Sequence, residues 1–90
     1  MAIEERSVED RVFGVVREVL GIDDLFVIAP EHLLSEDLGA ESIHMPDLFM
    51  ELEEEFDIDI PEFDFEGSLQ VSDLLDLVNY ELDRKNQGAA

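Results

Sequence analysis

The sequence predicts an all-α fold, a small bundle of three main helices and one short helix with a long loop after the first helix. Two observations favour this fold. Apolar residues recur at helical spacing in three separate segments, and the short runs with strand propensity have no second strand to pair with. Ninety residues provide one core, so we place a single domain at residues 1–85 and expect residues 86–90 to form a frayed tail.

The first predicted helix runs from Ser7 to Leu20. Ser7 precedes Asp10 by three residues, which resembles a capping box with a shorter acid, and Gly21 is typical of a C-terminal stop. The apolar face of this helix comprises Val8, Val12, Val15, Val16, Val19 and Leu20.

A long loop is expected over residues 22–40. The run LFVI within it has strand propensity but no partner, and Pro30 with Glu31 is typical of a short helical turn. A loop of this length in a small domain is usually functional or held down by packing. We expect five apolar side chains to anchor it in the core, namely Phe26, Ile28, Leu33, Leu34 and Leu38.

The second predicted helix runs from Ser42 to Phe56, and the segment DIDIPE breaks it at Pro61. Ile58 and Ile60 alternate with acids but have no partner strand, so this segment is expected to be loop. The helix has two distinct sides, an apolar stripe of Ile43, Leu48, Phe49, Leu52 and Phe56 and an acidic side of Glu51, Glu53, Glu54 and Glu55.

The rest of the chain supplies the short helix and the last main helix. The segment EFDFEGS is expected to hold one helical turn before Gly67. The last helix is expected to begin between Ser68 and Ser72 and to end near Arg84. Its buried face comprises Val71, Leu74, Leu75, Val78 and Leu82.

The charge of the chain is strongly one-sided. The formal net charge is −20, and no Lys or Arg occurs between Glu18 and Asp83. Such a field repels nucleic acids and anionic membranes and attracts basic protein surfaces. The absence of cysteine excludes disulfides, thiolate zinc sites and a cysteine nucleophile. With no apolar targeting core and no run long enough to cross a bilayer, we expect a cytoplasmic protein without membrane insertion.

Ser42 opens the acidic helix and admits four interpretations: a plain N-cap, a nucleophile, a phosphorylation site, or the anchor of a permanent phosphodiester. The chain offers only His32 and His44 as bases and has no Gly-x-Ser-x-Gly elbow, so catalysis by Ser42 is not expected. A helix start suits a phosphate of either kind, because its free N–H groups and dipole favour an anion.

The segment DLGAESI, residues 37–43, resembles the Asp-Leu-Gly-Ala-Asp-Ser-Leu signature of acyl carrier proteins. Further landmarks of that family stand in register with it. They are IAPEHLLSEDLG upstream, LEEEF at residues 52–56, an Ile-Pro-Glu turn at residues 60–62 and the valine at position 71 that opens the last helix. The resemblance extends from about Val8 to Leu82, which is essentially the whole domain.

The resemblance implies that Ser42 carries 4′-phosphopantetheine, delivered from coenzyme A by a phosphopantetheinyl transferase. The arm ends in a thiol that holds acyl groups as thioesters, so the thiol is the cofactor's. The family's second helix is a common recognition surface for acyl-transfer and chain-elongation enzymes with basic docking surfaces. The partner contacts that the resemblance implies here are Glu41, Ile43, Asp47, Met50, Glu51, Glu53, Glu54 and Glu62.

Four residues near Ser42 depart from the family pattern. Glu41 and Ile43 keep the charge or the volume of the usual residues. His44 replaces an acid and titrates near neutral pH, and we interpret it as a surface histidine. Pro46 lacks the N–H that would bond back to the Ser42 carbonyl, so the helix is expected to start loosely or late. This change hints at a specialised carrier.

Two further patterns concern cargo and metals. Phe65 and Leu74 stand where the family commonly has smaller residues, and they either narrow its acyl-chain pocket or repack the core. The acids of residues 57–66 lack the glycine and the ligand order of a calcium-binding loop, so we expect no metal site.

We therefore predict a monomeric acyl carrier protein, not an enzyme, that serves fatty-acid-type synthesis. One alternative is a specialised carrier for a polyketide or modified-lipid pathway. An alternative of a different class is an acidic protein-interaction module in which Ser42 is only a helix cap or phosphosite. A calcium sensor is the third alternative.

Overall fold

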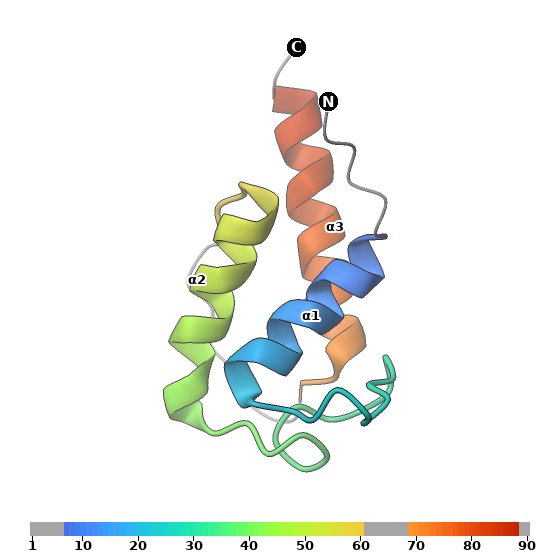
Figure 1. Ribbon diagram of the computed structural model, residues 1–90. Coiled ribbons are helices and arrows are strands. Elements are labelled where there is room, and N and C mark those ends of the chain that lie inside the picture. The colour runs from blue at the N-terminus through green and yellow to red at the C-terminus, as the bar shows by residue number, and fades with distance from the viewer. Residues whose placement is uncertain (1–6, 61–68, 89–90) are drawn as a thin grey trace.

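The computed structural model describes residues 7–60 and 69–88 of the chain. It shows the helices α1 (Val8–Leu20), α2 (Met45–Phe56) and α3 (Val71–Gly88), with the 3-10 turn η1 (Ser42–His44) leading directly into α2. In Figure 1, α2 and α3 run in the same direction, and α1 crosses in front of α3 and ends beside the lower part of α2. The described residues form no strand and a single isolated bridge between Leu33 and Gln70. The predicted all-α bundle is confirmed.

Helix α1 has the caps that its sequence predicts. Ser7 lies in the extended region, and its Oγ accepts the Asp10 N–H at 3.0 Å, so one of the unpaired donors of the first turn is satisfied. Gly21 ends the helix with φ 67° and donates its N–H to the Arg17 carbonyl. This left-handed conformation favours glycine, which has no Cβ to clash with the backbone.

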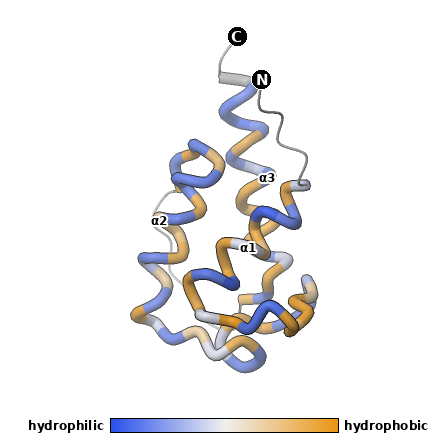
Figure 2. Tube along the Cα trace, in the orientation of Figure 1, coloured by the Kyte–Doolittle hydropathy of each residue, from blue (hydrophilic) through white to orange (hydrophobic). Residues whose placement is uncertain are grey.

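One hydrophobic core joins the three helices and the long loop. Hydrophobic and hydrophilic stretches alternate along each helix in Figure 2, as amphipathic packing requires. Each large apolar side chain that is fully buried stabilises the fold by about 1.5–3 kcal/mol relative to an exposed one. The predicted faces of the first and last helices are confirmed. Within residues 7–60 and 69–88, the fully buried side chains are Val12, Val16, Leu34, Leu48, Leu52, Val71, Leu74 and Val78.

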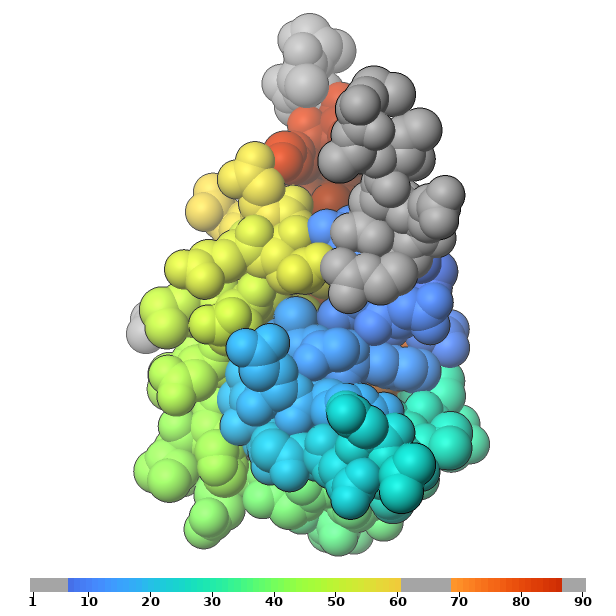
Figure 3. Space-filling model, viewed as in Figure 1, coloured from blue at the N-terminus to red at the C-terminus, as the bar shows by residue number. Residues whose placement is uncertain are grey.

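Two apolar side chains and three backbone hydrogen bonds hold the long loop in place. Ile28 and Leu34 are buried as predicted, while Leu33 and Leu38 are half-buried. The Leu34 N–H donates to the Leu69 carbonyl at 2.8 Å. The N–H groups of residues 71 and 72, at the start of α3, donate to the carbonyls of residues 32 and 30. In Figure 3, this loop and α1 cover much of the face that is seen.

The prediction that Phe26 anchors the loop is wrong. Its side chain is 41% exposed and lies against the His32 ring, with the ring centroids 5.4 Å apart. The reason is a turn at residues 23–26, in which the Asp23 carbonyl accepts the Phe26 N–H and the Asp23 carboxylate accepts the Leu25 N–H. The turn leaves Leu25 and Val27 on the surface as well.

Helix α3 begins where the sequence predicts and ends later. It continues to Gly88 instead of ending near Arg84, so residues 86–88 of the expected tail are helical. Residues 85–87 are Lys, Asn and Gln, none of which breaks a helix as glycine or proline does. The short helix expected before Gly67 lies outside the described residues, and the short helical turn that the structure does show is η1. No helix among the described residues is long and apolar enough to span a membrane.

Arg11 links α1 to the end of α2. Its Nε donates to the Glu55 carboxylate at 2.8 Å, and its Nη2 donates to the Glu55 backbone carbonyl at 2.7 Å. The guanidinium also lies 4.4 Å from the centre of the Phe56 ring. Both charged side chains are mostly buried, at 22% and 29% exposure, so water screens this pair less than a surface pair.

We expect Arg11→Ala to lower the free energy of unfolding by about 2 kcal/mol, because it removes charged hydrogen bonds and a cation–π contact together. Arg11→Lys keeps the charge but loses the forked geometry, so its loss should be intermediate. Urea unfolding followed by circular dichroism measures both. Equal stability of the wild type and Arg11→Ala would show that the contact contributes nothing.

Candidate functional site

The start of α2 is shaped by Pro46. In an α-helix that began at Ser42, residue 46 would donate its N–H to the Ser42 carbonyl, and proline has none. Instead the Met45 N–H donates to that carbonyl, three residues on, which makes the first turn 3-10. The regular helix begins at Met45 with Pro46 in its first turn, where proline is tolerated. The predicted late start is confirmed.

Ser42 is therefore not the N-cap, so the first of its four interpretations, a plain N-cap, is wrong. Glu41 occupies the N-cap position of η1, and Ser42 is the first residue of the turn. The Ser42 side chain is exposed. Its hydroxyl has no hydrogen-bond partner among the residues that the structure describes. A hydroxyl that does not cap a helix is available for a covalent attachment.

The backbone leading into Ser42 is held firmly although the side chain is free. Asp37 accepts the Leu33 N–H through its carboxylate at 2.8 Å. Gly39 adopts φ 75°, which turns the chain towards the helix. Ala40 is buried, and its N–H donates to the Leu34 carbonyl at 2.8 Å. These contacts fix the position of the serine backbone relative to the core.

His44 completes the turn that carries Ser42. Its Nδ1 accepts the Glu41 N–H at 2.8 Å, and its own N–H donates to the Glu41 carbonyl at 2.9 Å. The Nδ1 lone pair is therefore occupied by the backbone. Sequence reasoning treated His44 as a surface histidine and missed this role. The signal was its place three residues after the N-cap, where Glu or Gln closes a capping box.

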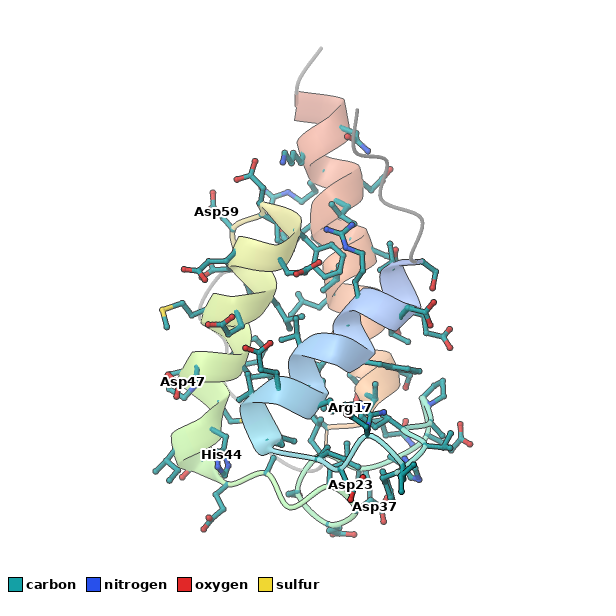
Figure 4. The ribbon with its side chains drawn as sticks, in the orientation of Figure 1. Arg17, Asp23, Asp37, His44, Asp47 and Asp59 are labelled. Carbon is teal, nitrogen blue, oxygen red and sulfur yellow. The ribbon has the colours of Figure 1, made fainter. Side chains whose placement is uncertain are left out.

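The side of α2 that points away from the other helices carries half of the eight predicted partner contacts. Asp47 lies on it in Figure 4. Ile43 is 73% exposed and Met50 is 49% exposed, so Ile43 does not belong to the buried stripe in which it was predicted. Periodicity failed there because Ile43 lies in the 3-10 turn. We define the outer face of α2 as the exposed residues Ile43, Asp47, Met50 and Glu54.

The other acids of this region differ in their surroundings. Glu41 is exposed beside Ser42, and Glu51 is half-buried. Glu53 accepts the Ile60 N–H at 2.8 Å, so its carboxylate holds the segment after α2. Glu55, which the sequence placed on the acidic side, is bonded to Arg11. Glu62 and Phe65 lie outside the described residues.

A groove at the opposite end of α2 is distinct from the serine site. It separates the C-terminal ends of α2 and α3, at the far end of the bundle from η1 (Figure 1). Lys85 crosses it and donates to the carbonyl and the carboxylate of Asp57, at 2.7 and 3.0 Å. Within residues 7–60 and 69–88, no three His, Cys, Asp or Glu side chains gather as metal ligands. The groove is lined by Glu53, Asp57, Ile58, Asp59, Ile60, Glu81, Arg84 and Lys85.

A small helical bundle that presents a free hydroxyl at the start of an acidic helix has the architecture of a carrier domain. Over residues 10–80 the chain matches the family described as "Phosphopantetheine attachment site". It is 36% identical over 74 residues to the acyl carrier protein of Chlorobium phaeovibrioides (strain DSM 265 / 1930), an alignment that covers 82% of this chain and 94% of that protein. The chain therefore belongs to the acyl carrier protein family, whose cofactor is covalently attached 4′-phosphopantetheine.

Proposed function

We propose that this chain carries acyl groups as thioesters on a 4′-phosphopantetheine arm attached to Ser42. The observation that supports this site most directly is the exposed Ser42 hydroxyl, which has no partner among the described residues. A serine that only capped the helix would have its oxygen bonded to a backbone N–H, as Ser7 does at α1. The start of a helical segment also suits the negative charge of a phosphodiester.

The proposed partners are a phosphopantetheinyl transferase and the acyl-transfer and chain-elongation enzymes of fatty-acid-type synthesis. The outer face of α2, together with Glu41, Glu51 and Glu53, is their proposed binding surface. The family resemblance adds Glu62, which lies outside the described residues. A net charge of −20 attracts enzymes with basic surfaces and opposes self-association, which is consistent with a monomer. In this role the chain presents substrates and performs no chemistry itself.

One observation favours a specialised carrier for a polyketide or modified-lipid pathway. Pro46 and His44 give Ser42 a 3-10 setting in place of a regular helix start. Enzymes that dock on this region contact the backbone and side chains of that turn. A dedicated set of enzymes, adapted to this start of α2, is therefore the second candidate.

Mass spectrometry tests the proposed function. The apo chain is incubated with coenzyme A and a broad-specificity phosphopantetheinyl transferase, and a second sample lacks coenzyme A. We expect the first sample to gain one phosphopantetheinyl unit and fragmentation of its peptides to place that unit on Ser42. A chain that stays unmodified would favour the alternative, an acidic interaction module.

A further inference from the structure

The two histidines of the chain make the same local contact. His32 Nδ1 accepts the Ala29 N–H at 2.9 Å, and the His32 N–H donates to the Ala29 carbonyl at 3.0 Å. His44 and Glu41 form the matching pair, at 2.8 and 2.9 Å. Each histidine thus closes a four-residue turn through two reciprocal hydrogen bonds. The turn closed by His44 contains Ser42.

This contact exists only when Nδ1 carries no proton. A backbone N–H always donates, so the nitrogen that it contacts must offer a lone pair, and the imidazole proton then lies on Nε2. Protonation of the ring places a second donor opposite the Glu41 N–H, and the hydrogen bond is lost. A carboxylate or an amide oxygen at this position accepts the N–H throughout the pH range in which histidine changes charge.

We propose that His44 is a positioning residue for the modification of Ser42. Its unprotonated Nδ1 holds the Glu41 N–H and thereby fixes the turn that presents the serine hydroxyl, and protonation of the ring releases that turn. This inference rests on the proposed function of Ser42. It makes the loading of the carrier arm sensitive to pH, in a way that a carrier with an acid at this position is not.

The charged residues that flank His44 in the sequence are acids. Glu41 precedes it by three residues and Asp47 follows it by three, and both are exposed. The helices that pack on α2 carry acids as well, Glu18 in the last turn of α1 and Asp73 in the first turn of α3. Arg17, in the same turn of α1, donates a hydrogen bond from its guanidinium to the Asp23 carbonyl.

His44→Asn provides a matched comparison, because the Oδ1 of asparagine takes the place of the histidine Nδ1 and does not titrate. The initial rates of modification are measured for the wild type and this variant with the same transferase and coenzyme A, from about pH 8 to about pH 5.5, the range in which histidine changes charge. The ratio of the two rates removes the pH dependence of the transferase. We expect equal rates at the upper end and a wild-type rate about fivefold lower at the lower end, the factor of one ordinary hydrogen bond.

Two further variants separate the positioning of Ser42 by His44 from a general effect of replacing a histidine. His44→Ala lacks the acceptor and should be modified about fivefold more slowly than the wild type at the upper end of the range. His32→Asn makes the same chemical change in the other turn, which does not contain the serine, and should keep the pH dependence of the wild type. A rate ratio between the wild type and His44→Asn that stays constant across the range would overturn the inference.

Nuclear magnetic resonance tests the turn without the transferase. We expect the Glu41 amide signal of the wild type to shift together with the titration of the His44 ring, and that of His44→Asn to stay constant. A Glu41 amide that does not follow the ring overturns the inference. If no form of the chain is modified, the proposed function fails, and the Glu41 amide alone still decides whether His44 holds the turn.

Discussion

Ser42→Ala should abolish the addition of phosphopantetheine and with it every thioester that the chain can hold. The substitution removes the proposed nucleophilic oxygen and leaves the backbone of the turn in place. Folding should be almost unaffected, with a change in the free energy of unfolding within about 0.5 kcal/mol, the usual range for surface substitutions. The Ser42 hydroxyl caps no helix and is exposed, so its loss breaks no contact among the described residues.

Ser35→Ala is the matched control for this prediction. Ser35 is also exposed, and it lies in the loop seven residues before Ser42. This variant should accept one phosphopantetheinyl unit at the wild-type rate. Intact-mass spectrometry of the two variants after the same incubation decides between the sites. Addition to the Ser42→Ala chain would place the arm on another hydroxyl and refute the assignment of Ser42.

The helices were predictable wherever local chemistry and periodicity agreed. Ser7 and Gly21 cap α1 as the sequence indicates, and Val71, Leu74 and Val78 form one buried face of α3. Capping and helical spacing act within a few residues, so they can be recognised in the sequence. The end of α3 was harder to place, since no proline or glycine interrupts the chain between Arg84 and Gly88.

The errors arose where neighbouring segments or a single proline decide the conformation. Phe26 is apolar, but the turn at residues 23–26 directs it towards His32 and away from the core. Ser42 has the residue type of an N-cap, yet Pro46 shifts the helix start and leaves its hydroxyl free. The sequence predicted that shift, but it did not show which residues would close the new turn. The contact between His44 and Glu41 depends on side-chain direction, which periodicity does not specify.

Charge reversal on the outer face of α2 should slow the modification of Ser42 strongly. The variant Asp47→Lys, Glu54→Lys places two positive charges on the exposed side of the helix that begins at the serine. At low ionic strength we expect kcat/KM of the phosphopantetheinyl transferase, with this carrier as its substrate, to fall about tenfold or more. Tenfold is the lower end of the effect of electrostatic steering. The change should appear mainly in KM, because these charges guide the encounter and do not touch the reacting atoms.

The double variant Asp59→Lys, Asp76→Lys distinguishes a local binding surface from the charge of the whole chain. It has the same net charge, and both acids are exposed. Asp59 lies at the other end of the bundle from His44 in Figure 4, and Asp76 lies on α3. If the binding surface is local, this pair should lose much less kcat/KM than the pair on α2. The difference between the two variants should then shrink as added salt reduces the Debye length to about 8 Å and below. Equal losses in the two variants would mean that the transferase responds to total charge alone, and the outer face of α2 would then have no special role.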